Sequence, residues 1–306
     1  MPELPTARRP RVFASLLPLC FPVLALAFFA PLVVLVLLRS SGLAGFDRVT
    51  EWPVADFKEP SGIVYHPGRD TLFVCGDQGD IGEISLDGRL LASAHIGGDL
   101  EAITVAPATG LLYVVREGHE ILLELRPDDF KLTRRFNIQR GFRGDAEYLK
   151  RGGNGIEGLT FVPDAKHAED GRFFAVNEDD PPVLIELAVP LRSMSGKFGE
   201  ARVTASHGLS VRPLSGLLWL TDARKFLISS ALWKAVYVFD EAGRREASVP
   251  VPGLMQEGIA RLPDGSFVIV QDVGGLIKWS PESDPFITAS PPEAKAGDEP
   301  SVESEK

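Results

Sequence analysis

The chain of 306 residues has little of what several common classes of site require. Its two cysteines are Cys20, in an apolar segment, and Cys75, in a predicted strand, so no intramolecular disulfide is expected. The five histidines share no metal-ligand spacing. No Gly-x-Ser-x-Gly elbow and no glycine-rich loop ending in Lys-Ser/Thr are present. These absences argue against a serine hydrolase of that kind and against a P-loop nucleotide site.

Positive charge and helical periodicity are also scarce. The 32 Lys and Arg residues are outnumbered by 42 Asp and Glu residues, and the net charge of −10 argues against nucleic acid as a partner. After residue 45, apolar residues almost never recur at the spacing of an amphipathic helix. The main body of the chain is therefore predicted to be all-β.

One long apolar run is present near the start. Residues 12–38 carry no charged side chain, and about 20 apolar residues are enough to span a bilayer. Arg8, Arg9 and Arg11 precede the run, so residues 1–11 are expected in the cytoplasm and the rest of the chain outside it. We interpret residues 12–38 as a transmembrane signal-anchor helix in contact with the lipid bilayer, and 39–45 as a linker. A cleaved signal peptide is the alternative.

A short phrase recurs five times after the linker. Each copy has a Ser or Glu, then a small residue, then a β-favouring apolar run. The copies are Pro60-Ser61-Gly62-Ile63-Val64, Leu100-Glu101-Ala102-Ile103-Thr104, Ile156-Glu157-Gly158-Leu159-Thr160, Leu214-Ser215-Gly216-Leu217-Leu218 and Gln256-Glu257-Gly258-Ile259-Ala260. Their spacing of about 40 to 58 residues is close to that of β-propeller blades.

Each phrase is followed by turns and further short apolar runs, which indicates about four strands per repeat. The prediction is a β-propeller of five four-stranded blades over residues 46–280. A sixth blade hidden within 125–155 or 187–213 is left open, and a β-sandwich ranks well below. The last repeat ends near Trp279 after about three strands, so the segment 46–57 is expected to supply the missing outer strand and close the ring. Residues 281–306, rich in Pro, Glu, Ser and Asp, are predicted to form a disordered acidic tail.

The repeats resemble those of the SdiA-regulated family of bacterial proteins. The resemblance rests on the five phrases, on Thr71-Leu72-Phe73-Val74 and on Phe174-Ala175-Val176-Asn177-Glu178, and it covers roughly residues 50–280. It implies a β-propeller behind a single-pass anchor in the bacterial inner membrane, on the periplasmic side. It implies little about activity.

Two series of polar residues are the candidate site. Innermost strands of a propeller line its axis, so Glu101, Glu157 and Glu257 are expected to converge at one mouth, with Ser61 and Ser215. A second series follows the next strand of each repeat: Asp77, Glu117, Glu178 and Asp272, with Ser230 in the fourth. Either the glutamates recur because blades are duplicated and cap backbone groups, or they form a ligand site. Three carboxylates in close range require relief from water, protonation, a cation such as Arg116, or a hard divalent cation such as Ca²⁺.

Two functions follow from this reading. The first is a membrane-anchored extracytoplasmic propeller that binds a small-molecule or protein ligand at its channel face, with a bound divalent cation as one option. The alternative is a metal-assisted hydrolase of the phosphoesterase, esterase or lactonase type that uses the channel carboxylates. The fold does not decide between them.

Overall fold

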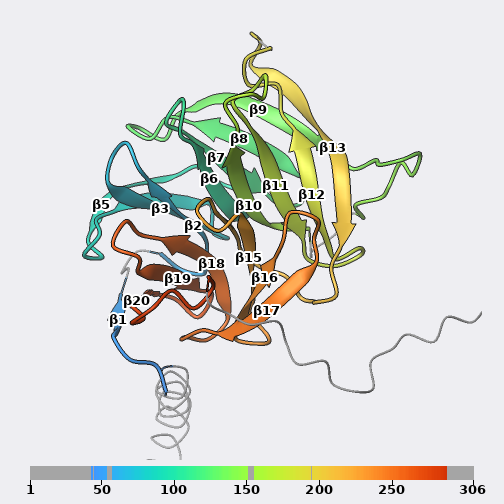
Figure 1. Cartoon of the computed structure of the whole chain (residues 1–306). Coiled ribbons are helices and arrows are strands. Elements are labelled where there is room, and N and C mark those ends of the chain that lie inside the picture. Colours follow the sequence, from blue (N-terminus) through green and yellow to red (C-terminus); the bar gives the residue numbers. More distant parts are fainter. Residues whose placement is uncertain (1–42, 44, 54–56, 151–154, 194, 288–306) are drawn as a thin grey trace, which may run out of the picture. The chain divides into compact units, whose positions relative to one another are not determined.

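The computed structural model describes residues 43, 45–53, 57–150, 155–193 and 195–287. All the named elements in these ranges are β-strands, so the predicted all-β class is confirmed (Figure 1). The predicted transmembrane segment 12–38 lies outside the described residues. Within them, no helix has both the length and the apolar character needed to cross a bilayer.

The strands fall into five four-stranded antiparallel units. Unit 1 is β2 (Pro60–His66), β3 (Thr71–Gly76), β4 (Asp80–Ile84) and β5 (Leu90–His95), and unit 2 is β6 (Leu100–Ala106), β7 (Leu111–Arg116), β8 (Ile121–Leu125) and β9 (Leu132–Gln139). Unit 3 is β10 (Ile156–Pro163), β11 (Gly171–Asn177), β12 (Val183–Ala188) and β13 (Phe198–Gly208). Unit 4 is β14 (Leu217–Leu220), β15 (Lys225–Ser230), β16 (Ala235–Phe239) and β17 (Arg245–Pro250). Unit 5 is β18 (Gln256–Arg261), β19 (Phe267–Gln271), β20 (Leu276–Trp279) and β1 (Val49–Trp52).

The units close into a propeller-like ring. β1, from the start of the described chain, pairs with β20 from its end, which confirms the predicted closing strand. Consecutive inner strands contact one another around the circle, and β18 of unit 5 contacts β2 of unit 1 (Figure 1). Each described hydrophobic cluster joins two neighbouring units, and one of them joins unit 5 to unit 1. The ring is therefore held by side-chain packing as well as by β1.

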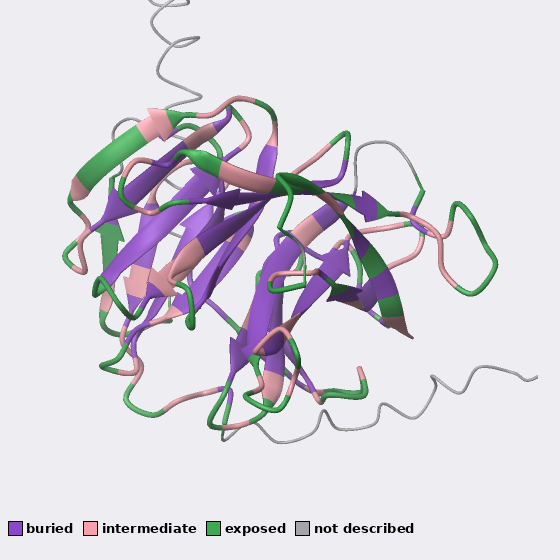
Figure 2. Ribbon diagram, turned by 90° about the horizontal axis from the view of Figure 1, so that it is seen from above, coloured by how far each residue is buried: buried purple, intermediate pink, exposed green. Residues whose placement is uncertain are grey.

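This packing explains why the strands read as continuous apolar runs. Successive side chains of a strand point to opposite faces of its sheet. In β3, Leu72 and Val74 pack toward unit 5, whereas Phe73 and Cys75 pack toward unit 2. Both faces of each sheet are covered, and Figure 2 shows the buried strands inside and the exposed outer strands at the periphery. Only the outermost strands, such as β5, are largely exposed.

Units 2 and 3 are joined at their outer edges as well. β9 pairs with β13 in parallel, from Phe198 opposite Arg135 to Arg202 opposite Gln139, which merges the two units into one eight-stranded sheet. β9 and β13 lie in the two stretches left open for a sixth blade. Within the described ranges these stretches supply outer strands of existing units, and the described strands form five units.

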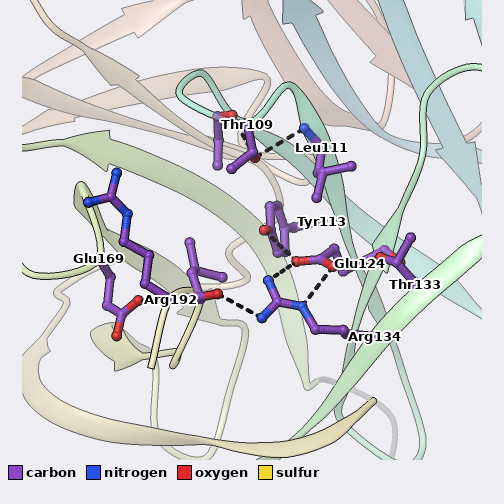
Figure 3. Close-up of polar contacts among 10 residues, drawn as sticks. Thr109, Leu111, Tyr113, Glu124, Thr133, Arg134, Glu169 and Arg192 are labelled. Carbon is purple, nitrogen blue, oxygen red and sulfur yellow. Dashed lines mark hydrogen bonds and ion pairs between the residues drawn. The ribbon is translucent and has the colours of Figure 1, made fainter. Parts of the chain in front are cut away.

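A buried ion pair reinforces the junction between units 2 and 3. Glu124 of β8 accepts hydrogen bonds from Tyr113 (2.7 Å) and from Arg134, whose guanidinium also donates to the carbonyl of Leu191 (2.7 Å; Figure 3). Burial alone would raise the pKa of Glu124, but the bonds from Arg134, Thr133 and Tyr113 outweigh it and lower that pKa. A buried carboxylate in this chain is thus ionised where an arginine pairs with it.

The folded part of the chain extends past the predicted boundary at residue 280. The side chain of Phe286 is 2 % exposed, and its ring lies 4.9 Å from that of Phe267 and 6.3 Å from that of Trp279. Asp284 pairs with Arg261 at 3.0 Å. The polar composition of the tail gave no sign that this segment packs on the domain, because a single phenylalanine, Phe286, supplies its apolar surface.

We expect Phe286→Ala to lower the free energy of unfolding by about 3 kcal/mol, because it leaves a cavity against Phe267 and Trp279. Urea unfolding followed by tryptophan fluorescence measures the change. Ile287→Ala is the matched control, since Ile287 is 49 % exposed and its truncation should change stability by less than about 0.5 kcal/mol. If the two variants were equally stable, Phe286 would not contribute to the folded domain, and the domain would end at residue 280 as predicted.

Candidate functional site

The recurring phrase places its Ser or Glu at a break in strand register. In units 1, 2, 3 and 5, the register between the first and second strands shifts at the phrase. The residues of the first strand that have no partner on the second are Ser61, Glu101, Glu157 and, together with Gly258, Glu257. Such β-bulges bend the strand and redirect the side chain of the extra residue. The same local irregularity therefore aims the same position of four units at one place.

The second series is fixed by a backbone hydrogen bond that recurs in four units. In each, the N–H of the acidic residue donates to the carbonyl just before the phrase. The pairs are Asp77 to Glu59 (3.2 Å), Glu117 to Asp99 (2.8 Å), Glu178 to Gly155 (2.8 Å) and Asp272 to Met255 (3.0 Å). The bond ties the end of the second strand to the start of the first, so both series lie at the same end of the ring.

The two series meet in a pocket of about 390 Å³, here called the acidic pocket. It is lined by Ser61, Asp77, Glu101, Glu157, Glu178, Pro213, Leu214, Ser215, Ala231, Leu232, Met255, Glu257 and Asp272. Six of the seven predicted carboxylates are thus brought together, and Ser61 and Ser215 join them as expected. Glu117 is not a lining residue; its carboxylate accepts a hydrogen bond from the N–H of Gly155 (3.2 Å). Ser230 is fully buried and also does not line the pocket.

The pocket narrows sharply where the inner strands come together. The next residues of the five phrases are Gly62, Ala102, Gly158, Gly216 and Gly258, and they line a space of only about 10 Å³. One water molecule needs about that volume. The acidic pocket is accordingly a blind recess, which suits binding at the mouth rather than passage along the axis.

A hydrogen bond joins the carboxyl groups of Glu101 and Glu157 in the acidic pocket. Burial raises the pKa of Glu101 well above its ordinary value, and the nearby carboxylates of Glu157, Asp77 and Asp99 raise it further. Burial and the charges of Glu178, Glu117 and Glu257 also raise the pKa of Glu157. A hydrogen bond joins the two side chains, so protonated Glu101 donates to the Glu157 carboxylate.

The same causes act on the other members. Burial, followed by the charges of Asp272, Glu178 and Asp77, raises the pKa of Glu257 to about 8. Burial also raises the pKa of Asp77, partly offset by a hydrogen bond from Ser61, and it raises the pKa of Asp272. All five shifts have the same sign because each carboxylate loses water and faces others of its own charge.

Among the described residues that line the acidic pocket, none has a basic side chain. Arg116, one of the options for relieving the carboxylates, packs its side chain against Gly98 and is not among the lining residues described for the pocket. The contrast with Glu124 is direct, since that buried carboxylate has Arg134 beside it and a lowered pKa. Around the acidic pocket, crowding of carboxylates therefore favours their protonated forms, as the raised pKa values of Glu101, Glu157 and Glu257 indicate.

Comparison with known proteins gives the family. The family model described as SdiA-regulated matches residues 44–271. This chain belongs to the SdiA-regulated family. The match begins just before β1 and ends at the last residue of β19, so it includes both polar series except Asp272.

No curated protein matches the sequence of this SdiA-regulated chain. Among solved structures, the glutaminyl cyclase of Myxococcus xanthus is similar, with 14 % identity, a TM-score of 0.53 and coverage of 74 % of this chain and 92 % of that one. A Bacteroides caccae protein of unknown function (14 % identity, TM-score 0.45, coverage 72 % and 73 %) and a nidogen/laminin complex (12 %, 0.46, 70 % and 72 %) are more distant. At such identities the first likeness shows the fold alone.

One residue at the site of this SdiA-regulated protein, Asp99, was not predicted from the sequence. One carboxylate oxygen each from Asp77, Asp99 and Glu101 lies within 4.8 Å of the other two. Oδ1 of Asp99 is buried and has no hydrogen-bond partner among the described residues. The signal was available, because Asp99 precedes Glu101 by two positions and residues i and i+2 of an extended chain share a face.

Two charged segments near the acidic pocket, 177–182 and 139–155, have mostly structural contacts. In the acidic loop 177–182, Asp179 pairs with Arg212 (3.4 Å) and Asp180 with Lys150 (3.5 Å), so only Glu178 reaches the pocket. In the insertion 139–155, Arg140 is buried against Glu120. Residues 151–154 of that insertion lie outside the described residues.

Proposed function

We propose that the acidic pocket binds a cation and that this protein is a ligand-binding β-propeller. The observation that carries the proposal is the convergence of six carboxylates in one blind pocket whose described lining residues include none that is basic. Charge of this density is stabilised by protonation or by a positive ligand. Binding a cation would return the raised pKa values of Glu101, Glu157 and Glu257 toward their ordinary range.

Ca²⁺ is the cation that best fits the three carboxylates that lie closest together, those of Asp77, Asp99 and Glu101. Ca²⁺ takes six to eight oxygen ligands at about 2.3–2.6 Å, so two ligands of one ion lie up to about 5 Å apart. Asp77, Asp99 and Glu101 offer three carboxylate oxygens within 4.8 Å of one another, and the buried Oδ1 of Asp99 has no other described partner. Mg²⁺ fits less well, since it requires a tighter octahedral shell.

We expect Ca²⁺ in millimolar excess to raise the melting temperature of the chelator-treated protein by about 5 °C or more, because a ligand that binds only the folded state stabilises it. Mg²⁺ should give a smaller shift. Differential scanning fluorimetry, with isothermal titration calorimetry for the stoichiometry, measures both effects.

The matched variants are Asp99→Asn and Glu101→Gln, which remove ligand charge, and Glu51→Gln, which removes an exposed charge from β1. The first two should lose the Ca²⁺ shift and the third should keep it. If wild type and all three variants respond alike, or if no heat of binding is detected, divalent-cation binding at this pocket is refuted.

A metal-assisted hydrolase is the second candidate function. Its supporting observation is that Glu157, whose pKa is raised by burial and by Glu178, lies beside the proposed Ca²⁺ ligands and hydrogen-bonds to Glu101. A carboxylate of raised pKa can act as a general acid or base, and a metal ion can polarise an ester or phosphoester. Screening phosphoester, ester and lactone substrates with wild type and Glu157→Gln separates the functions: turnover lost in the variant supports the hydrolase.

We further propose that residues 12–38 hold the propeller at the bacterial inner membrane, with the acidic pocket on the periplasmic side. The charge-free run behind Arg8, Arg9 and Arg11 supports this orientation. Carbonate extraction of membranes followed by protease treatment of spheroplasts tests it. A protein released by carbonate, or protected from the protease, contradicts the proposal.

A further inference from the structure

A second pocket lies on the ring axis, at the end opposite the acidic pocket. Its volume is about 500 Å³, and all five units line it with the second half of their first strand or the residues just after it. In four units a proline stands at or just beyond the end of that strand: Pro67, Pro107, Pro163 and Pro263. Proline has a fixed φ and no N–H, so it gives a stiff strand end. We call this space the proline-rimmed pocket.

The lining of the proline-rimmed pocket is mostly apolar, and its described charges cancel. Val64 and Leu218 line it and are only partly buried, so their side chains are accessible from the axis. The charged members of its described lining are Arg261 and Asp222, which form an ion pair with each other at 2.7 Å. Burying a charged ligand here would cost its hydration without providing a free counter-charge. The lining therefore favours an uncharged ligand.

Two buried threonines place hydrogen-bond donors at the narrow end of this pocket. Thr104 is 4 % exposed and Thr160 is 5 % exposed, and each follows a residue of the axial constriction by two positions. The Thr104 hydroxyl accepts a hydrogen bond from the N–H of Phe161 (3.2 Å), and the Thr160 hydroxyl accepts one from the N–H of Trp219 (3.2 Å). Each hydroxyl still has its own proton to donate, and no acceptor for that proton occurs among the described residues. Such a donor favours a ligand that brings an acceptor.

The repeat adds backbone donors at the same level of the axis. The N–H groups of Phe161 and Trp219 point away from the second strands of their units, toward the threonines. The residues at the same register in the other units are Tyr65, Val105 and Arg261. Because N–H directions alternate along a strand, these three N–H groups point the same way. The side chains that replace a threonine before them are Ala260, Val64 and Leu218, none of which can accept a hydrogen bond.

We infer that the proline-rimmed pocket binds an uncharged, mostly apolar small molecule through a carbonyl oxygen. A carbonyl oxygen has two lone pairs and no proton, which matches the hydroxyl donors of Thr104 and Thr160. The carbon body of the ligand then lies against Val64 and Leu218 and points outward, between the prolines. A pocket of about 500 Å³ is within the range of small-molecule sites. The constriction of about 10 Å³ separates it from the acidic pocket, so this inference does not depend on the proposed cation.

The test is calorimetric titration of the full chain, held in lipid nanodiscs, with 2-butanone, 2-pentanone and 2-hexanone, after subtraction of the heat from empty nanodiscs. Each added methylene should tighten binding about two- to fourfold, because its burial is favourable. Hexanoate has as many carbons as 2-hexanone but carries a charge, and it should bind at least about tenfold more weakly. No saturable heat with any ketone would overturn the inference, and hexanoate binding as tightly as 2-hexanone would overturn the assignment of an uncharged ligand.

Variants locate the binding on the donors. Thr104→Val should weaken 2-hexanone binding about fivefold, whereas Thr104→Ser, which keeps the hydroxyl, should stay within about twofold of wild type. Thr204→Val is the matched control, since Thr204 is exposed on β13 and is not among the lining residues of the pocket. Equal affinity of the valine and serine variants at position 104 would overturn the role of the hydroxyl.

A filling variant tests the place of binding without touching the hydroxyls. Val64→Phe should weaken 2-hexanone binding at least about tenfold, because the larger side chain occupies the pocket. Leu91→Phe is the matched control, since Leu91 is 44 % exposed on β5 and is not among the lining residues. A cooperative thermal transition shows that each variant is folded. Wild-type affinity in folded Val64→Phe protein would overturn the assignment of the ligand to this pocket.

Discussion

Replacing Gly216 by alanine is expected to destabilise the ring by about 3 kcal/mol or more. A Cβ atom at position 216 would lie 2.2 Å from the carbonyl oxygen of Glu257 and 2.8 Å from Cα of Gly258. Both are backbone atoms of the next unit, so no side chain can swing away. Units 4 and 5 would have to separate.

Separation would also break the hydrogen bonds that join the two units at this point. The hydroxyl of Ser229 donates to the carbonyl of Glu257 (2.6 Å), and the hydroxyl of Ser215 donates to the carbonyl of Gln256 (2.9 Å). Overpacking costs about 1–3 kcal/mol and each lost bond about 1 kcal/mol, so the sum reaches the stated size. In a domain of this length that corresponds to a fall in melting temperature of roughly 6–12 °C.

Gly208→Ala is the matched control, because a Cβ there has no atom within 4 Å. It should leave the urea midpoint within experimental error of wild type. Gly258→Ala extends the test to the closure of the ring, since its Cβ would lie 2.8 Å from the carbonyl oxygen of Ser61, in unit 1. If Gly216→Ala and Gly258→Ala were as stable as Gly208→Ala, the close approach of the inner strands would be wrong.

The close contacts between inner strands also explain why the fold could be predicted from the sequence. The small residue of each phrase is required where inner strands converge, and the apolar run after it is required because both faces of every sheet are covered. Leu72 and Phe73, adjacent in sequence, pack against different units. A repeated small residue followed by unbroken apolar residues therefore indicates sheets packed radially around an axis. The closing strand followed from counting strands in the last repeat.

What the sequence did not indicate depends on contacts between segments with no repeated signal. The parallel pairing of β9 with β13 joins two outer strands whose exposed faces are polar and unlike each other. Phe286 docks as one apolar residue in a polar tail. Neither composition nor period distinguishes such segments from ordinary connections.

The residues of the candidate site also fall into those that the repeat predicts and those that it does not. Glu101, Glu157 and Glu257 were predictable because the repeat fixes their place, and the structure adds the bulge that aims them. Glu117 shares the repeat position of Asp77 but lies beside the pocket, where it accepts a hydrogen bond from Gly155 at the end of the long insertion. The insertion is specific to that unit, so the departure from the repeat could not be read from the pattern. Asp99 was missed because only its own unit has an acidic residue directly before the phrase and also a glutamate within it.

The second large effect concerns pH. The cation-free protein is expected to lose stability as pH rises from about 4.5 to about 8, the opposite of a protein whose carboxylates are paired with cations. Below pH 4.5, Glu257 is protonated in both folded and unfolded chains and contributes nothing. Between its ordinary pKa of 4.5 and the folded value of about 8, the folded chain keeps a proton that the unfolded chain releases, so the free energy of unfolding falls.

Above pH 8 the loss from Glu257 is complete and constant, on the order of 5 kcal/mol at about 1.4 kcal/mol per pKa unit. The raised pKa values of Asp77, Glu101, Glu157 and Asp272 add losses of the same sign. Carboxylates with lowered pKa values, such as Glu124, change stability only below their ordinary pKa, so the two effects occupy separate pH windows. Urea titrations at pH 5.5, 7 and 9 measure the fall.

Glu257→Gln should be more stable than wild type at pH 9 and nearly equal to it at pH 5, because glutamine cannot ionise in the pocket. Glu51→Gln, on the exposed strand β1, should follow wild type at every pH. Ca²⁺ should flatten the wild-type profile, since a bound cation lowers the pKa values of the carboxylates around it. A wild-type profile that stays level or rises from pH 5.5 to 9 without Ca²⁺ would mean that the carboxylates are compensated in the folded protein, and the case for a cation at this pocket would fall with it.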